Sequence, residues 1–301
     1  TGSWRTIVEG KLAIPADLAV TTEGGKETVH VADVFSYRNV DGTTGAVTDV
    51  LRVHGETHSY PTGISVGPKH TLLSSWFSNT VQKIDRKTGK LVATLGEFTA
   101  PVDALEAADG TIYVAELATG NLVKVSPDGK TRTNIVKELR GPVALAQGAG
   151  TQIYVTEIAA GAVTQIDVAT GARKVVADNL AGPEGIDVGP DGKLYVAEVG
   201  QKRVVAIDPA NGHKVVIASN LDVTPPDTLF QLRGCKVLSP DGVVFMAYGV
   251  PPELPPGHFD EAEANPVLRA SHFIKIGDRP PPRIIVDDEE PQDGLKPPGR
   301  G

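Results

Sequence analysis

Cysteine, aromatic residues and long apolar runs are all scarce in this chain of 301 residues. The single cysteine, Cys235, excludes an internal disulfide framework and a zinc site built from several cysteines, so we expect a small buried apolar residue there. No segment approaches the run of about 18 apolar residues that a membrane-spanning helix needs. Aromatic residues make up 5% of the chain, whereas 33 glycines and 23 prolines predict many turns and few long helices. The composition favours an all-β protein.

Positive charge is also in short supply, because the formal net charge is −8. A chain without a basic stripe is a poor match for phosphate backbones or anionic lipids, so we expect neither nucleic acid nor a membrane as a partner. The sequence opens TGSWRTIVEG, without an initiator methionine or an apolar signal segment. We expect a location outside the cytoplasm, extracellular or periplasmic, with a signal peptide already removed.

A repeated frame is present along most of the chain. It begins at the prolines of IPADLAV, YPTGISV, APVDALE, GPVALAQ and GPEGIDV, which are Pro15, Pro61, Pro101, Pro142 and Pro183. The last four starts are 40, 41 and 41 residues apart, and LRGCKVLSPDGVVFMAYG is a sixth, more diverged copy. A period of this length is typical of propellers or solenoids, and the content of each unit separates the two.

Each unit reads as four short strands. An apolar run follows the proline, and a turn such as PDG or ADG leads to a second run: TIYVAEL, QIYVTEI or KLYVAEV. A third run alternates, as in VVAID, and ends at TG, DG or NG before a fourth. Asp-Gly and Asn-Gly between alternating runs are strong hairpin signals, and four antiparallel strands per unit is a propeller blade.

We therefore predict an all-β fold, a single six-bladed β-propeller of four-stranded antiparallel blades over residues 1–286. The segment WRTIVEG has the pattern of an outer strand and is expected to complete the last blade. A seven-bladed ring stays open as an alternative, because PPRIIVDD has the same pattern. Residues 249–267 are expected to form an insertion loop in the last blade, and residues 287–301 a disordered tail.

The stretches GPEGIDVGPDGKLYVAE and ADGTIYVAELATGNLVKVSPDG resemble repeats of the NHL, SMP-30/gluconolactonase and virginiamycin B lyase propeller group, over roughly Pro15 to Gly249. The resemblance implies the fold. It leaves the activity open, because the group contains calcium- or zinc-dependent lactonases, a magnesium-dependent ring-opening lyase and blades that only bind partners.

The same resemblance points to the residue after each proline, at the mouth of the central channel, as the place of the lactonases' metal ligands. These positions are Ala16, Thr62, Val102, Val143, Glu184 and, in the sixth copy, Cys235. Only Glu184 is a ligand for a hard cation. A small strand shift would let Asp17 and Asp103, one residue further on, join Glu184 in holding Ca²⁺ or Mg²⁺; otherwise we expect no cofactor.

Glu184 and Glu198 lie fourteen residues apart, a spacing at which the lyase of the group pairs a His with a Glu. Two facing carboxyl groups can repel so that one retains its proton, which predicts a catalytic acid–base pair. The alternative is architectural. An acidic residue recurs at Glu116, Glu157 and Glu198, and such a series is expected to accept backbone hydrogen bonds that lock the blades.

A patch of larger residues departs from the repeat in the first two blades. Its members are Phe35, Tyr37, Arg38, Trp76 and Phe77, which stand where other blades have small residues. Aromatic residues with an arginine have the composition of a binding hot spot, so we predict a partner-binding rim; core packing is the alternative.

Two functions follow from these patterns. The first is an NHL/SMP-30-like binding propeller that takes a small molecule or protein partner at the channel mouth and rim. The second is an enzyme, a Ca²⁺- or Mg²⁺-dependent lactonase-like hydrolase or a lyase that uses Glu184 and Glu198. That the chain is one subunit of a larger assembly stays open.

Overall fold

The computed structural model describes residues 4–9, 11–12, 15–33, 36–52, 60–221, 233–237, 244–249 and 271–276. Its regular structure is β-strand, apart from one short 3-10 turn at Val199–Gln201. Within these residues there is no helix suited to crossing a membrane. The expected tail, and the expected insertion loop beyond Gly249, lie outside the described residues.

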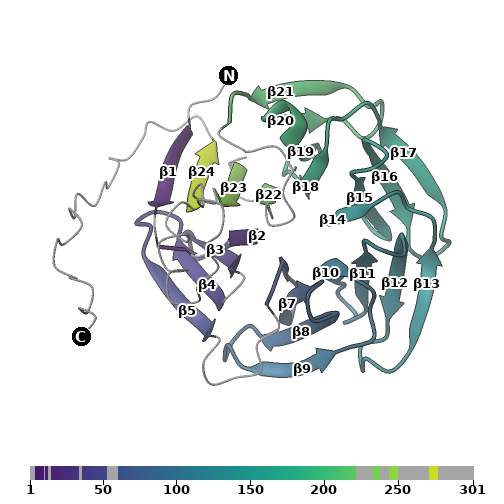
Figure 1. Cartoon of the computed structure of the whole chain (residues 1–301), viewed down its shortest axis with the longest axis horizontal. Helices are drawn as coiled ribbons and strands as arrows, with labels where there is room; N and C mark the ends of the chain where they lie inside the picture. Colours follow the sequence, from purple (N-terminus) through teal and green to yellow (C-terminus); the bar gives the residue numbers. More distant parts are fainter. Residues whose placement is uncertain are drawn as a thin grey trace, which may run out of the picture.

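Five blades each consist of four strands that are consecutive in the chain and pair antiparallel (Figure 1). The first contains β2 (Pro15–Glu23), β3 (Lys26–Asp33), β4 (Ser36–Asp41) and β5 (Val47–Arg52). The second contains β6 (Gly63–Val66), β7 (His70–Ser75), β8 (Thr80–Asp85) and β9 (Leu91–Leu95). The third contains β10 (Pro101–Glu106), β11 (Ile112–Glu116), β12 (Asn121–Val125) and β13 (Arg132–Val136). The fourth contains β14 (Pro142–Gln147), β15 (Gln152–Glu157), β16 (Ala162–Asp167) and β17 (Arg173–Ala177). The fifth contains β18 (Pro183–Val188), β19 (Leu194–Glu198), β20 (Arg203–Ile207) and β21 (Lys214–Ala218).

A further sheet combines the two ends of the chain. Its order is β1-β24-β23-β22, made of β1 (Trp4–Glu9), β24 (Ser271–Ile276), β23 (Val244–Gly249) and β22 (Arg233–Val237). Strand β1 pairs antiparallel with β24, and β22 contacts both β18 and β2. This composite sheet therefore lies between the fifth and first blades. The pairing confirms that WRTIVEG joins strands from the far end of the chain.

The prediction of six blades, or seven, needs correction. The chain forms five repeat blades of four consecutive strands, and the remaining sheet is of a different kind. The diverged copy LRGCKVLSPDGVVFMAYG supplies only β22 and β23, and β24 follows more than twenty residues after β23. The repeat does not continue into a sixth blade of the same kind, because the fourth strand of that sheet comes from the N-terminal segment.

The turn motifs act as the sequence indicates. Gly129 and Gly192, which close the two PDG turns within the described residues, have φ of +77° and +76°, a conformation that favours glycine. Each glycine donates its backbone N–H to the carbonyl three residues earlier, Gly129 to Ser126 at 2.8 Å and Gly192 to Gly189 at 2.9 Å. The chain reverses at these points and the next strand pairs with the last.

Apolar side chains fill the spaces between adjacent blades. Ile186 and Val196 of the fifth blade are fully buried against Tyr154 and Val163 of the fourth. Fully burying an aliphatic side chain of this size contributes about 2 kcal/mol, so the contact between blades is a main source of stability. Tyr113 and Tyr154, which take the same position in successive blades, belong to such clusters and pack in the core.

Hydrogen bonds also join neighbouring blades, at one repeated place near the start of each innermost strand. Asp17 of the first blade accepts the backbone N–H of Ile64 in the second at 2.9 Å. Asp103 of the third blade accepts the backbone N–H of Leu145 in the fourth at 2.8 Å. All four residues are buried, so each carboxylate satisfies a backbone donor that water does not reach.

The second and fourth blades use a hydroxyl group from the neighbouring strand instead. Ser74 donates to the carbonyl of Val102 at 2.8 Å, and Thr156 donates to the carbonyl of Glu184 at 2.6 Å. The two kinds of bond alternate around the ring, carboxylate in the first and third blades and hydroxyl in the second and fourth.

The space between the first two strands of each blade explains this alternation. Asp17 and Asp103 face alanines across the strand pair, whereas Ser74 faces Gly63. A Cβ on Gly63 would lie 2.3 Å from the Ser74 Oγ, so there is room for a polar side chain on one strand only. In the fifth blade the equivalent residues are Gly185 and Ala197, and neither carries a polar side chain.

Candidate functional site

The predicted site at the channel mouth centres on Glu184. This residue is the second of β18 and is 6% exposed. The corresponding residues Ala16 and Thr62 are buried, and Val102 and Val143 are half-buried. Glu184 is therefore the one acidic residue at this position in the five blades, as the sequence indicates.

Glu198 is fully buried, and both of its carboxylate oxygens are bonded. One accepts the backbone N–H of Ala181 at 2.9 Å, and the other pairs with Nε of Arg203 at 2.6 Å. Ala181 precedes β18, so the carboxylate holds the connection between the fourth and fifth blades. The acid–base assignment of Glu184 and Glu198 stays a prediction, and the contacts of Glu198 are those of a structural residue.

The other recurrent glutamates make the same kind of contact. Glu116 accepts the backbone N–H of Thr99 at 2.9 Å, and Glu157 accepts that of Arg140 at 2.6 Å. In each case the donor lies in the connection that enters the same blade. These are the backbone hydrogen bonds that the architectural interpretation of the glutamate series predicts.

The predicted metal ligands are not brought together. Asp17 and Asp103 point sideways and bind the next blade, as described above, because side chains alternate along a strand. Neither these two residues with Glu184 nor any other three His, Cys, Asp or Glu residues in the described ranges form a cluster suited to a metal ion. The geometry does not supply the predicted Ca²⁺ or Mg²⁺ cage.

The aromatic residues of the predicted rim do not share one environment. Trp76 and Phe77 contact each other with ring centroids 5.0 Å apart, and Phe77 is 48% exposed. Tyr37 is 3% exposed and packs in the interior. Phe35 lies outside the described residues. For Tyr37 the core-packing alternative is therefore the one that the structure supports, because its ring is buried among apolar side chains.

Arg38 is engaged in ion pairs within its own blade. Its guanidinium lies 3.1 Å from the carboxylate of Asp33 and 2.8 Å from that of Asp49. Partner binding by Trp76 and Phe77 stays a prediction.

A cleft of about 1220 Å³ separates the first and second blades. Strands β2, β3 and β4 form one wall, and the start of β7 with the β8–β9 turn forms the other. The cleft includes Glu23, at the end of β2, and so lies at the ends of the blades opposite the channel mouth. Tyr37 is the one described residue of the predicted rim that lines this cleft.

The floor of the cleft is a hydrogen-bonded chain of uncharged groups. The two ring nitrogens of His30 lie 2.9 Å from the hydroxyl of Thr21 and 2.7 Å from the hydroxyl of Tyr37. The Tyr37 hydroxyl lies 3.5 Å from that of Thr71 in the second blade, at the limit of a hydrogen bond. The chain therefore reaches from one wall of the cleft to the other.

Burial keeps the hydrogen-bonded side chains of the floor uncharged. Burial above all, and then the positive charge of Arg86, lowers the pKa of His30 from 6.5 to about 4. Burial also raises the pKa of Tyr37 above its ordinary value of 10.0. At neutral pH the floor thus carries an imidazole and a phenol that donate and accept hydrogen bonds without a net charge.

Arg86 stands at the edge of the cleft, after the last residue of β8. Its guanidinium donates to the carbonyl of Gly67 at 3.1 Å and pairs with the carboxylate of Glu23 at 2.7 Å. Arg86 also lines a second cavity of about 610 Å³ beside the inner ends of β6 and β10. Arg86 therefore lines both the cleft and this second cavity.

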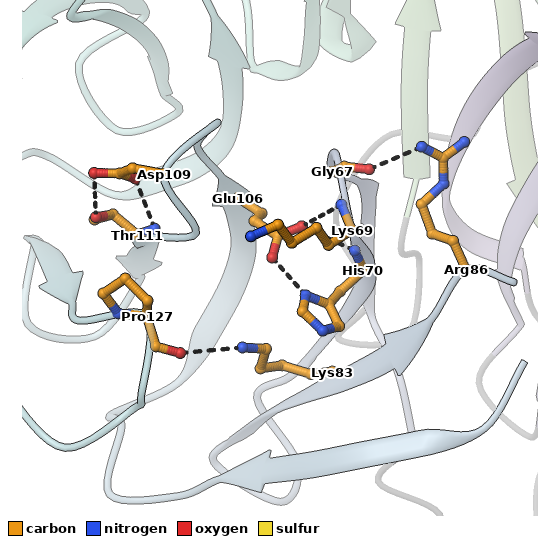
Figure 2. Close-up of polar contacts among 9 residues, drawn as sticks. All are labelled: Gly67, Lys69, His70, Lys83, Arg86, Glu106, Asp109, Thr111 and Pro127. Carbon is orange, nitrogen blue, oxygen red and sulfur yellow. Dashed lines mark hydrogen bonds and ion pairs between the residues drawn. The ribbon is translucent and has the colours of Figure 1, made fainter. Parts of the chain in front are cut away.

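A buried carboxylate fixes the turn that leads into β7 (Figure 2). Glu106 accepts the backbone N–H of Lys69 at 3.0 Å and that of His70 at 2.9 Å, and also pairs with the His70 ring at 2.5 Å. Burial acts to raise the pKa of Glu106, but the bonds from His70 and Lys69 outweigh it and the pKa is lowered. Figure 2 shows Lys69 and His70 on this turn and Arg86 on a separate segment, after the end of β8; all three residues line the cleft.

Sequence reasoning missed the cleft, although a signal was present. His30 takes the position in the second strand where other blades have Tyr113, Tyr154 or Tyr195, and Tyr37 takes that of the apolar Leu122 in the third. His30 faces Asn39, and Tyr37 is two residues from Asn39, so both departures fall on one face of adjacent strands. Their contact was readable from the repeat.

Comparison with known protein families gives one short match. The model described as "Strictosidine synthase-like, N-terminal" matches residues 170–199, which span the boundary between the fourth and fifth blades. No curated protein matches the sequence.

Solved structures resemble the whole chain. A gluconolactonase from Xanthomonas campestris is 15% identical, with a TM-score of 0.67 over 92% of this chain and 89% of its own. Virginiamycin B lyase from Staphylococcus aureus is 12% identical, with a TM-score of 0.61 over 93% of this chain and 100% of its own. Regucalcin from Agrobacterium tumefaciens, described as a calcium-binding protein, is 15% identical, with a TM-score of 0.58 over 92% of this chain and 96% of its own. At these identities the likeness concerns the fold, and the chain is similar in fold to the SMP-30/gluconolactonase and virginiamycin B lyase group of propellers.

Proposed function

We propose that the protein is a binding propeller, and that the cleft between its first two blades holds a small polar molecule. The observation that carries the proposal is the chain of Thr21, His30 and Tyr37 along the floor of a cleft of about 1220 Å³. A cleft of a few hundred to about a thousand Å³ with a few convergent polar groups is the usual form of a small-molecule site.

The polarity of this floor supports recognition of a polar molecule. A buried His and a buried Tyr replace the tyrosine and apolar side chains of the other blades, and burying polar groups is unfavourable unless they are hydrogen-bonded. The one donor and one acceptor of the neutral His30 ring are both used within the floor, by the hydroxyl groups of Thr21 and Tyr37, so the remaining hydrogen-bonding capacity of those hydroxyl groups is what the floor offers to a ligand. A molecule with hydroxyl or amide groups fits this chemistry.

The test is a thermal-melting screen of small polar compounds against the wild type, Tyr37→Phe and a matched control. Tyr154→Phe is the control, because it also removes the hydroxyl of a buried tyrosine but lies in the fourth blade. A compound that raises Tm in the wild type and in Tyr154→Phe but not in Tyr37→Phe supports the proposal. Stabilisation that persists in both variants places the ligand elsewhere and overturns it.

A second candidate is a hydrolase or lyase acting on a lactone, ester or uronic-type substrate at the channel mouth. The observation that favours it is the buried carboxyl-bearing residue Glu184 at the second position of β18. If Ca²⁺ or Mg²⁺ takes part, Glu184 is the residue that would hold it, and the fold shared with gluconolactonase and regucalcin makes those ions the ones to try.

This candidate is tested by melting after chelator treatment, with and without excess Ca²⁺ or Mg²⁺. A ligand bound only by the folded state at about 100 times its Kd adds roughly 2.7 kcal/mol to the free energy of unfolding. A rise in Tm that disappears in Glu184→Ala supports the candidate. If neither ion raises Tm, the metal-dependent form of it fails.

A further inference from the structure

We propose that the molecule bound in the cleft is a small anion, held through a carboxylate or phosphate group by Arg86, with Lys69 and Lys87 adding to the positive charge of the cleft. This proposal rests on the proposed function, because it names the ligand class of the same cleft. Its experiment is chosen so that the two can fail separately.

The charge of the cleft is opposite to that of the protein. The chain as a whole carries a formal net charge of −8. The residues that line the cleft include four cations, Lys26, Lys69, Arg86 and Lys87, and two carboxylates, Glu23 and Asp85. Lys26 is paired with Asp41 at 3.3 Å, outside the lining, so the excess comes from the other cations. A hollow with an excess of positive charge attracts anions and raises their local concentration.

The carboxylates do not neutralise this excess. Asp85 accepts the backbone N–H groups of Lys87 and Thr88, at 3.0 and 2.8 Å, and is thereby committed to the β8–β9 turn. Within the described residues, the ammonium groups of Lys69 and Lys87 have no ion-pair partner. Two cations are thus left to face a ligand.

Arg86 is the anchor that the geometry favours. Its partner Glu23 has a side chain that is 76% exposed, whereas that of Arg86 is 29% exposed. An ion pair with an exposed carboxylate contributes little, so a ligand anion can replace Glu23 at small cost. The carbonyl of Gly67 holds the guanidinium from the other side, which leaves its planar fork in position for a carboxylate or a phosphate.

The turn that carries Lys69 is held in place without using that side chain. Glu106 binds the backbone N–H groups of Lys69 and His70, and a Cβ on Gly67 would lie 2.5 Å from the Cβ of Glu106. Glycine therefore lets the carboxylate approach closely enough to fix the turn. In Figure 2 the Lys69 side chain extends past Glu106 and away from the Arg86 guanidinium, so Lys69 adds positive charge at the cleft without contacting the group that Arg86 binds.

The uncharged part of the ligand would meet the floor. His30 and Tyr37 are neutral hydrogen-bonding groups on the floor of the cleft. The positive charge of Arg86 contributes to lowering the pKa of His30. An anion that also carries hydroxyl groups could bind Arg86 through its charged group and the floor through its hydroxyl groups.

Titration calorimetry with three compounds that share one carbon frame tests the proposal: glycerol, glycerate and glycerol 3-phosphate. We expect glycerate or glycerol 3-phosphate to bind and glycerol not to, with binding weaker at roughly 0.15 M salt than at low salt because exposed charges are screened. Binding of only one of the two anions distinguishes a carboxylate from a phosphate ligand.

Three variants locate the binding. Arg86→Gln is expected to weaken it at least about tenfold, and Glu23→Gln to strengthen it several-fold, because the guanidinium is released. Lys174→Gln, an exposed lysine on β17, is the control and should leave it unchanged. A gain of affinity in Glu23→Gln cannot arise from damaged folding, so it remains informative if Arg86→Gln is unstable.

Binding of neither anion, or equal losses in Arg86→Gln and Lys174→Gln, would overturn the proposal. If an uncharged compound shows Tyr37-dependent stabilisation while both anions fail, the cleft remains a binding site and only its anion specificity is wrong. If anions bind and this binding depends on Arg86, but no compound depends on Tyr37, then anion binding by the cationic residues is supported and the proposed contact of the ligand with the floor is wrong.

Discussion

The carboxylate of Asp103 accepts the backbone N–H of Leu145 at 2.8 Å, across the boundary between the third and fourth blades. Both residues are buried, at 1% and 0% exposure. A side chain of one blade thus satisfies a backbone donor of the next, and the same relation holds between Asp17 and Ile64. These contacts tie the innermost strands together independently of the apolar core.

Replacing Asp103 with alanine should lower the free energy of unfolding by about 1–3 kcal/mol, because the N–H of Leu145 is left buried and unpaired. Asp103→Asn retains an acceptor and should cost less. The measurement is urea unfolding, with Lys137→Ala at an exposed position as the control, expected within about 0.5 kcal/mol of wild type. Equal stability of Asp103→Ala and the control would show that this bond does not hold the blades.

Glu198 and Glu184 should respond differently to amide substitution. Glu198→Gln removes the charge that pairs with Arg203 and should destabilise the protein by about 2 kcal/mol, since bonds to charged groups contribute roughly 1.5–3 kcal/mol. Glu184→Gln should change stability less. Denaturant midpoints of the two variants decide the matter: a Glu198→Gln protein as stable as wild type would remove the architectural explanation.

Acid should destabilise the fold through His30. Its pKa is about 4 in the folded state against 6.5 for the free group, so the unfolded chain binds a proton that the folded chain does not. Stability is therefore complete above pH 6.5 and falls towards pH 4, by roughly 3 kcal/mol, since each pKa unit corresponds to about 1.4 kcal/mol.

Unfolding free energies measured between pH 7 and pH 4 check this expectation. The pH slope should be smaller by about one proton in His30→Gln, whatever the absolute stability of that variant. His213→Gln is the control, because that residue is exposed on a turn. Identical slopes in wild type and His30→Gln would contradict the buried, neutral imidazole.

Glu106 should add a second loss at lower pH. Its pKa is lowered in the folded state, so its contribution is present above the unfolded value of 4.5 and is lost as pH falls through the folded pKa. Glu106→Gln should reduce this acid-induced loss and also lower stability at neutral pH by about 1–3 kcal/mol, because bonds from the Lys69 and His70 backbone and the His70 ring are weakened.

Urea unfolding at pH 7 and below pH 4.5 measures both effects. The matched control is Glu97→Gln, whose side chain is 92% exposed and whose removal should change little. If Glu106→Gln and Glu97→Gln behave alike, the turn at Lys69 and His70 does not depend on this carboxylate.

Local sequence determined the blades. The prolines of the repeat, the PDG and ADG turns and the alternating runs predicted four antiparallel strands per unit, because hairpin formation depends on residues a few positions apart. The recurrence of Glu116, Glu157 and Glu198 likewise indicated a structural role, and the hydrogen bonds agree. The number of repeat blades was overestimated, because the sixth copy of the repeat supplies only β22 and β23 to the last sheet rather than four consecutive strands.

Tertiary structure decided the sites. The side chains of Asp17 and Asp103 turn towards the next blade rather than towards Glu184, and spacing along one strand does not contain that direction. The cleft joins His30 of one blade to Arg86 of the next, residues 56 positions apart, and exists only because the blades pack at a particular distance and angle. The period of the sequence thus determines the strands and turns of each blade. The packing between blades determines which polar residues of different blades come into contact.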